Sequence, residues 1–451
     1  MSQGIGEITQ GSDTLKKREI DVLIVLGVTK KMDRPTVLMI PLATKMHANR
    51  IVEPVNLARE LLEKSGVKVF GRQAPALKAE DVSRSPVEEY DAIVVFLASG
   101  GTSELASQIV ADNPYFVWAY DEVNSLSSAL SVREKLKGIE AWRGEIVYNS
   151  LDEAPESILG QARASRLLKS LKGFNVGLIG DEQYFEEKTE DSKVLTDLFG
   201  MSVTEISIAS LIDEFRGQTD ENASKVMNGR FAMATIMEPS RKDLLKSCRM
   251  YLAFRSLIDT YKVDAVSLDC FRLIKRTGTS ACLGFALLID EGKVSVCEGD
   301  LRSLVLMMLF KAIAGPSWLG NLVQVDQSLN ILTLAHCTAP TSLAEAGGRI
   351  VLRSHFESGE GVSLDVPLRR MPITIANMQF KPLQLVVAKG ELLESQIGKF
   401  SLCRTQAKIK LKGDVNRFLQ FTGNHHVMAY GDWAETLRRI GERVGMSLIE
   451  V

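Results

Sequence analysis

The strongest constraint on the fold is the alternation of apolar strand-like segments with helical segments in the first part of the chain. Apolar residues at helical spacing predict a helix over Ile51–Ser65. The expected strands are Asp21–Val28, Thr36–Ala43, Val67–Phe70, Tyr90–Ser99, Pro114–Tyr120 and Glu145–Asn149. Such alternation predicts a parallel sheet with helices on both faces.

The polar segment Ser150–Pro155 is expected to join this unit to a second one of the same kind. A helix is expected at Glu156–Leu171, and the strand and helix pattern then restarts. The further strands are expected at Asn175–Gly180, Val203–Ser207, Ala265–Cys270, Phe285–Ile289 and Val294–Cys297, with helices at Lys242–Tyr261 and Leu301–Ala314. We therefore expect an N-terminal α/β domain at 1–155 and a central α/β domain at 156–346.

From Gly347 the pattern changes to short segments with period-two alternation, broken by Gly and Pro. Strands are expected at Arg349–Ser354, Val362–Val366, Ile373–Met378, Leu383–Ala388, Lys399–Cys403, Lys408–Leu411 and Ser447–Val451, with one helix at Asp432–Gly445. This pattern predicts an antiparallel barrel or sandwich over 347–451.

Composition excludes several classes of function. The chain has 54 Lys and Arg against 56 Asp and Glu, a net charge of −2, which argues against nucleic-acid binding. Its longest apolar run, Leu304–Gly315, contains Lys311 and is far shorter than the ~20 residues of a membrane span. The six Cys form no C-x-x-C pair and the N-terminus has no apolar signal segment, so a reducing cytoplasm is expected.

One candidate site residue is Glu298, which follows the expected strand Val294–Cys297 and precedes a helix. Ligands of α/β proteins bind at the carboxyl ends of strands, and a helix N-terminus favours a carboxylate. Asp300 is expected to be the N-cap of that helix. The alternative is that Glu298 is merely solvated.

A second acidic residue, Asp326, lies far enough along the chain for a helix and a return strand to bring it beside Glu298. Two carboxylates with an imidazole are a ligand set for Mn²⁺, Mg²⁺ or Co²⁺. His336 is the imidazole nearest to Asp326 in the sequence. In the adjacent pair His425 and His426, the side chains point to opposite faces if the segment is extended, so one of the two could also reach a site. The alternative is two unrelated acidic loop residues, a core histidine and a solvated histidine pair.

Several short motifs now resemble one family. In chain order they are SGGTSE (99–104), NSLSSALSVRE (124–134), SLDCF (267–271), CEGDL (297–301), VQVDQ (323–327), AHC (335–337), HFESGEG (355–361), CRTQ (403–406) and GNHHVMAYGDW (423–433). Together they resemble the L-fucose isomerase and L-arabinose isomerase superfamily, and more closely its shorter fucose-isomerase-like members. The resemblance implies two Rossmann-like α/β domains and a C-terminal antiparallel β-barrel.

The resemblance also implies one divalent cation, commonly Mn²⁺, and an active site formed between subunits of a trimer or hexamer. Glu298 and Asp326 would be metal ligands and the catalytic acid/base pair, and His426 the imidazole ligand. His336 is a further candidate, as a ligand or as a substrate contact.

The expected substrate contacts are His425, Asp269, Arg272 and Asn424. Arg272 and Lys275 belong to a small basic cluster, so the sequence is compatible with an anionic sugar substrate as well as with a neutral one. Asp326 stands where the arabinose branch has Glu, and the chain is shorter than typical members of either branch. The resemblance therefore does not identify the sugar substrate.

The expected activity is the metal-dependent interconversion of an aldose and a ketose through a cis-enediol. The proton that moves between C1 and C2 is too weakly acidic for an unaided carboxylate, so a Lewis acid must stabilise the enediolate. Two other functions remain open: an inactive sugar-binding protein of the same fold, and a metal-dependent lyase or aldolase that acts on a related enediolate.

Overall fold

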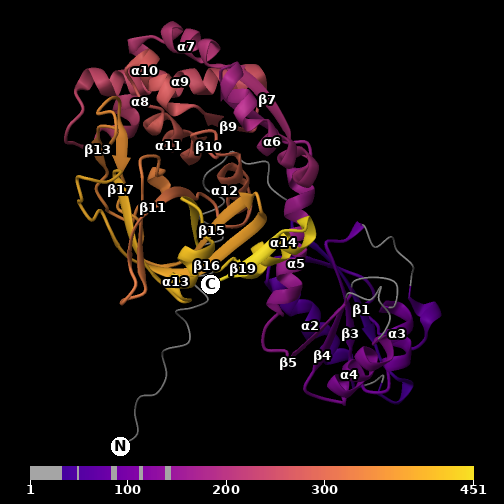
Figure 1. Cartoon of the computed structure of the whole chain (residues 1–451). Helices are drawn as coiled ribbons and strands as arrows, with labels where there is room; N and C mark the ends of the chain where they lie inside the picture. The colour runs from indigo at the N-terminus through magenta and orange to yellow at the C-terminus, as the bar shows by residue number, and fades with distance from the viewer. Residues whose placement is uncertain (1–32, 48–49, 83–88, 111–114, 138–143) are drawn as a thin grey trace, which may run out of the picture.

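The computed structural model describes residues 33–47, 50–82, 89–110, 115–137 and 144–451. The expected strand at Asp21–Val28 lies outside the described residues. Figure 1 shows an N-terminal unit that is set apart from the rest, and a larger body in which a helical layer faces a barrel. The predicted fold class is confirmed: two parallel sheets are followed by a closed antiparallel barrel.

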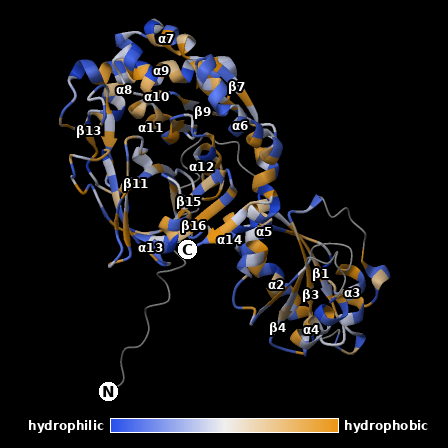
Figure 2. Ribbon diagram, viewed as in Figure 1, coloured by the Kyte–Doolittle hydropathy of each residue, from blue (hydrophilic) through white to orange (hydrophobic). Residues whose placement is uncertain are grey.

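The N-terminal unit is a five-stranded parallel sheet with the order β2-β1-β3-β4-β5, which reverses between β1 and β3. Its strands are β1 (Thr36–Leu42), β2 (Lys68–Phe70), β3 (Ala92–Leu97), β4 (Phe116–Tyr120) and β5 (Glu145–Asn149). Its helices are α2 (Val52–Lys64), α3 (Ser103–Val110) and α4 (Ser125–Leu136), with α5 (Glu156–Leu171) packed on β1 and β3. Figure 2 shows the hydrophobic residues along these strands, which are buried because helices cover both faces.

The central unit is a four-stranded parallel sheet with the order β10-β9-β6-β7. Its strands are β6 (Asn175–Gly180), β7 (Ser202–Ser207), β9 (Ala265–Leu268) and β10 (Val294–Cys297). Its helices are α6 (Glu182–Phe199), α7 (Ile208–Gly217), α8 (Asp220–Phe231), α9 (Arg241–Tyr261), α10 (Cys270–Thr277), α11 (Cys282–Asp290) and α12 (Leu301–Ile313). The expected strand at Phe285–Ile289 is part of α11, which is buried almost all round, and a short buried apolar run does not distinguish strand from helix.

The barrel is closed by antiparallel pairing in the order β15-β18-β11-β12-β17-β16, and β16 pairs back to β15. Its strands are β11 (Trp318–Asp326), β12 (Ile331–His336), β15 (Pro372–Phe380), β16 (Leu383–Ser395), β17 (Thr405–Leu411) and β18 (His425–Tyr430), with β19 (Ser447–Glu450) added in parallel beside β16. Helices α13 (Val415–Phe421) and α14 (Ala434–Val444) lie between its last strands. The expected strand at Lys399–Cys403 is a loop before β17.

The barrel takes two of its strands from before the expected boundary at 347. Because β11 and β12 pair with β18 and β17, sheet membership begins at Trp318. A small sheet, β8 (Thr235–Ile236), β13 (Val351–Arg353) and β14 (Ser363–Asp365), further ties the central unit to the last part of the chain. The central unit and the barrel therefore share one body, and α12 packs on β10 from one and on β15 and β18 from the other.

None of the described helices combines the length and the apolar character needed to cross a membrane.

Candidate active site

The turn between β10 and α12 holds Glu298 in an unusual backbone conformation. Glu298 has φ 62° and Gly299 has φ 58°, so two consecutive residues lie in the left-handed region. A Cβ at Gly299 would overlap the hydroxyl of Tyr184 on α6 and would lie 2.8 Å from its Cζ. At position 299 only glycine fits without displacing Tyr184. Glu298 is a non-glycine residue with a left-handed backbone, and such residues are concentrated at functional sites.

Asp300 performs two tasks that connect the central unit to the barrel. Its Oδ1 accepts hydrogen bonds from the backbone N–H groups of Arg302 and Ser303, each at 3.1 Å, so it is the N-cap of α12, as the sequence predicted. Its Oδ2 lies 2.7 Å from Nδ1 of His425 on β18. One buried carboxylate thus sets both the start of the helix and the orientation of a barrel histidine.

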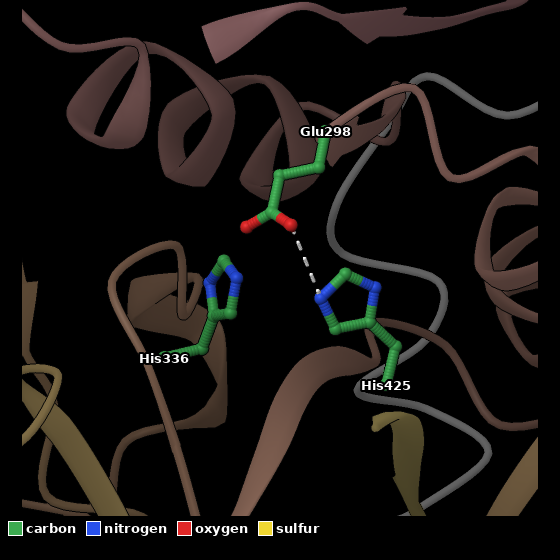
Figure 3. Close-up of side chains that lie close together, drawn as sticks. All are labelled: Glu298, His336 and His425. Atoms are coloured by element: carbon green, nitrogen blue, oxygen red, sulfur yellow. Dashed lines mark ion pairs between the residues drawn. The ribbon is translucent and has the colours of Figure 1, made fainter. Parts of the chain in front are cut away.

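Glu298, His336 and His425 converge on one point. Each offers a ligand atom, and these atoms all lie within 4.8 Å of one another. Figure 3 shows the three side chains facing each other, with Nε2 of His425 at 3.6 Å from Oε2 of Glu298. The three come from the end of β10, the end of β12 and the start of β18, which lie far apart in the sequence.

The two histidines of this cluster differ in their electrostatic surroundings. Burial lowers the pKa of His336 to about 4, so its imidazole is neutral at neutral pH. Burial also acts to lower the pKa of His425, but its hydrogen bond to Asp300 and the charges of Asp300 and Glu298 outweigh burial and raise that pKa. The same hydrogen bond holds the pKa of Asp300 below its ordinary value, although burial acts to raise it.

The donor set fits a divalent cation. One nitrogen of each histidine is occupied, because Nδ1 of His336 lies 3.0 Å from Thr338 Oγ1 and Nδ1 of His425 bonds Asp300. The other nitrogen of His425, Nε2, is buried and has no hydrogen-bond partner in the described part of the chain. Metal-binding histidines are usually oriented by a hydrogen bond at their second nitrogen, and a carboxylate with two imidazoles suits a borderline divalent ion.

A pocket opens onto this cluster. The residues that line it are Cys270, Phe271, Ile274, Ser280, Ala281, Cys282, Cys297, Glu298, Asn321, His336, Cys337, His355, Glu357 and Cys403. Its two carboxylates are Glu298 and Glu357. Sequence reasoning missed Asn321, His355 and Glu357 as lining residues, since none lies in a compact motif with Glu298.

Asp326 does not join the cluster, which corrects the predicted ligand and acid/base pair. It ends β11, is exposed, and its Oδ1 accepts hydrogen bonds from the backbone N–H groups of Ser328 and Leu329, each at 3.0 Å. The strand residue that pairs with His425 is Asn321, five positions earlier. The prediction assumed a strand that ends at the site, whereas β11 begins there and runs away from it.

Of the two adjacent histidines, His425 lies in the cluster, and not His426, which the resemblance implied as the imidazole ligand. His425 reaches Glu298, and His426 is turned away from it. His426 is fully buried, its Nε2 lies 2.6 Å from Thr422 Oγ1, and its ring lies 5.1 Å from that of Phe418 on α13. His426 therefore packs against α13 and is not in the cluster, as strand alternation requires for one of the two.

The other expected substrate contacts lie near the pocket but do not line it. Asp269 is the N-cap of α10, and Arg272 forms ion pairs with Asp269, at 3.1 Å, and with Asp181. Asn424 uses its backbone oxygen to accept a hydrogen bond from Leu322, at 3.2 Å. The charge of Arg272 is thus already balanced by two carboxylates.

Fold and cluster together define an α/β protein with a closed barrel, whose candidate site lies where strand β10 meets the barrel. No protein-family model matches the chain. A sulfoquinovose isomerase from Alkalicoccus urumqiensis is 23% identical over 398 residues, which cover 82% of this chain and 88% of the relative. The sulfoquinovose isomerase of Priestia megaterium is 22% identical over 364 residues, 74% of this chain and 79% of the relative.

A third protein of that name, from Clostridium sp., is 23% identical over 337 residues, covering 71% of this chain and 74% of its own length. The chain is therefore related, over most of its length, to bacterial sulfoquinovose isomerases. These relatives support the predicted reaction class, an aldose–ketose isomerase, which is an intramolecular oxidoreductase of carbohydrate metabolism.

Proposed function

We propose that the chain is a metal-dependent aldose–ketose isomerase whose reaction centre is the cluster of Glu298, His336 and His425. The observation that carries the proposal is the convergence of these three groups, from three distant segments, within 4.8 Å. Membership of the fucose and arabinose isomerase superfamily, which the sequence motifs favour, agrees with the relatives that the chain matches.

Glu298, His336 and His425 would hold the cation, for which Mn²⁺ is the first candidate and Mg²⁺ and Co²⁺ are alternatives. When bound, the ion would supply a Lewis acid beside the two sugar oxygens that change their bonding. The protein's part is to hold the three donors in place, and the Asp300 hydrogen bond does so for His425.

Proton transfer between C1 and C2 requires a carboxylate beside those carbons and a second group that exchanges the hydroxyl proton. We propose Glu298 for the first task, since its strained turn points its carboxylate at the cluster. Glu357 is our candidate for the second task, because it is the other carboxylate that lines the pocket. It replaces Asp326, which lies at the far end of β11.

A sulfonated sugar is our candidate substrate, because the relatives are named for one. The cation that favours it is Arg404, which is 8% exposed. Its charge acts on the carboxylates of Glu238 and Asp365, but among the described residues it forms no ion pair with either of them at 4.0 Å or less. Its Nε donates to the backbone oxygen of Ser354 at 2.8 Å, and its guanidinium lies over the ring of Phe356. Its neighbours Cys403 and His355 line the pocket.

The test uses the full chain, stripped of metal with a chelator and then assayed with Mn²⁺ against sulfoquinovose, D-glucose, L-fucose and L-arabinose. We expect a ketose product by NMR with Mn²⁺, no product without it, and deuterium at the exchanged carbon when the reaction runs in D₂O. Two shorter carbonyl products would instead indicate the lyase. Sugar binding without turnover of any aldose would indicate the inactive binding protein.

Variants separate the site from the substrate class. Glu298→Gln should lose turnover, and Asp326→Asn, the matched acidic change outside the cluster, should keep it. Arg404→Met should raise KM for sulfoquinovose and leave KM for a neutral aldose unchanged, with Lys275→Met, an exposed cation on α10, as its control. Equal effects of Arg404→Met on KM for both sugars would show that Arg404 does not recognise a sulfonate group. The predicted homo-oligomer with sites between subunits remains a proposal, which sedimentation of the same protein tests.

A further inference from the structure

Asn321 occupies a central place beside the cluster. It lies near the start of β11, where its Cα pairs with that of His425 on β18 and with that of Ala335 on β12. Ala335 directly precedes His336. One row of the barrel therefore runs from one histidine of the cluster, through Asn321, to the residue beside the other histidine. Residues directly opposite in an antiparallel pair share a face, so Asn321 and His425 project to the same side.

The side-chain carbonyl oxygen of Asn321 lacks a partner among the described residues. This atom, Oδ1, is buried, yet it accepts no hydrogen bond from any of them. A buried carbonyl oxygen without a partner has lost its hydration and gained nothing in return, so such groups call for an explanation. The side chain also lines the same pocket as Glu298 and His336.

The unpartnered atoms near this point form a group. Nε2 of His425 is also buried and without a partner among the described residues. These two unpartnered atoms lie on paired strands next to the carboxylate of Glu298. One cation that binds both atoms would explain them together, because a metal ion displaces the proton of a ligating imidazole nitrogen.

We propose that Oδ1 of Asn321 is a fourth protein ligand of the cation held by Glu298, His336 and His425. This inference rests on the proposed function, because it needs the same ion. An amide oxygen is a hard, neutral donor of the kind that divalent cations accept from Asn and Gln. The resulting set contains one carboxylate, so these four ligands would balance only part of the charge of a divalent ion.

The competing role for Asn321 is a hydrogen bond to the sugar. That role leaves the affinity for the metal ion alone unchanged, whereas ligation does not. Two variants separate the roles. Asn321→Leu removes the ligating oxygen at nearly constant side-chain volume, and Asn321→Asp replaces a neutral ligand with a charged one.

The experiment measures Mn²⁺ binding to the metal-free full chain, without sugar, from the electron paramagnetic resonance signal of the free ion. We expect Asn321→Leu to weaken binding by about tenfold or more, since even groups that only orient ligands contribute about 10–100-fold. Asn321→Asp should tighten binding by a similar factor, because it adds a negative charge at the ion. The matched controls are Gln324→Leu and Gln324→Glu, which make the same changes at an exposed position of β11 and should leave the affinity within about twofold.

Thermal unfolding of the same proteins gives a second readout. Asn321→Leu should fold at least as stably as the wild type without metal, because it removes an unpaired buried carbonyl, and should gain less from Mn²⁺. Asn321→Asp should be less stable without metal and gain more from it.

The possible failures are distinct. If the wild type binds Mn²⁺, Glu298→Gln weakens binding and both Asn321 variants bind as the wild type does, this inference is overturned and the proposed metal centre stands. If the wild type binds no divalent cation, both the role of Asn321 as a ligand and the proposed metal centre are refuted.

Discussion

Replacing Gly299 with alanine should destabilise the turn that presents Glu298, and replacing Tyr184 with phenylalanine should partly reverse the effect. A Cβ at position 299 would meet the hydroxyl of Tyr184 and would lie 2.9 Å from Cε of Lys188. The lysine side chain can swing away, whereas the tyrosine is 8% exposed and held in the core of the central unit. The tyrosine hydroxyl has no hydrogen-bond partner in the described part of the chain, so its removal breaks no bond.

The expected size follows from two separate effects. The φ of 58° costs an alanine roughly 1–2 kcal/mol, because its Cβ approaches the following carbonyl oxygen. The overlap with Tyr184 adds about 1–3 kcal/mol, the usual cost of overpacking a core. Gly299→Ala should therefore cost about 2–5 kcal/mol, and Tyr184→Phe alone should be close to neutral. In the double variant the overlap with the hydroxyl is removed, whereas the backbone strain and the 2.8 Å approach to Cζ remain, so we expect recovery of about 1–2 kcal/mol.

Scanning calorimetry of the four metal-free proteins measures this coupling. A change of 1 kcal/mol moves the midpoint by roughly 2–4 °C for a unit of 150–250 residues, so the predicted coupling exceeds the error of the measurement. Isomerase activity of Gly299→Ala should fall as well, since Glu298 and Asp300 flank the turn. Strictly additive effects of the two substitutions would refute the proposed overlap, and an alanine variant as stable as the wild type would refute the whole account of the turn.

Three further predictions concern other carboxylates. Asp300→Asn should keep the helix cap, since Asn is as good an N-cap as Asp, but should lower Mn²⁺ affinity about 10–100-fold by weakening the orienting bond to His425; unchanged binding would contradict the role assigned to Asp300. Asp326→Asn should keep activity within about twofold of the wild type, and inactivation as severe as that of Glu298→Gln would show that the cluster is misassigned. Burial raises the pKa of Asp365 to about 6, so its ionisation opposes folding as the pH rises from about 4 to 6; the stability advantage of Asp365→Asn should grow over that range to about 3 kcal/mol and stay level above it, whereas thermal midpoints with a constant difference at all pH values would exclude the effect.

Much of the fold could be predicted because its elements carry strong local patterns. The helix at Glu156–Leu171 and the strands at Asn175–Gly180 and Val294–Cys297 have the predicted bounds. The segment Phe285–Ile289 was assigned to a strand because a fully buried apolar run has no polar face from which to read its period. The start of the barrel was placed too late because β11 follows a helix, as the strands of the α/β units do, and only long-range pairing with β18 shows that it belongs elsewhere.

The residues of the candidate site could likewise be predicted only in part. Glu298 and Asp300 were found because a strand end followed by a capped helix is a local pattern. Alternation indicated that one of His425 and His426 faces the site, but the choice depends on the register of β18, and a slip of one residue exchanges the faces. Asp326 was misplaced for a related reason, since five residues along a strand separate it from Asn321 by roughly 16 Å.

The position of the cluster follows from the way the two larger parts of the molecule are joined. Helix α12 is apolar on nearly all sides because it packs on β10 and on the barrel strands β15 and β18 at once. A helix buried in this way leaves only its ends for polar groups, and its N-terminal end lies where β10 stops and β18 starts. The carboxylate that caps α12 is consequently close enough to hold His425. A change that shifts α12 against the barrel should therefore move Glu298 relative to His425. The geometry of the reaction centre thus depends on the apolar interface between α12 and the barrel.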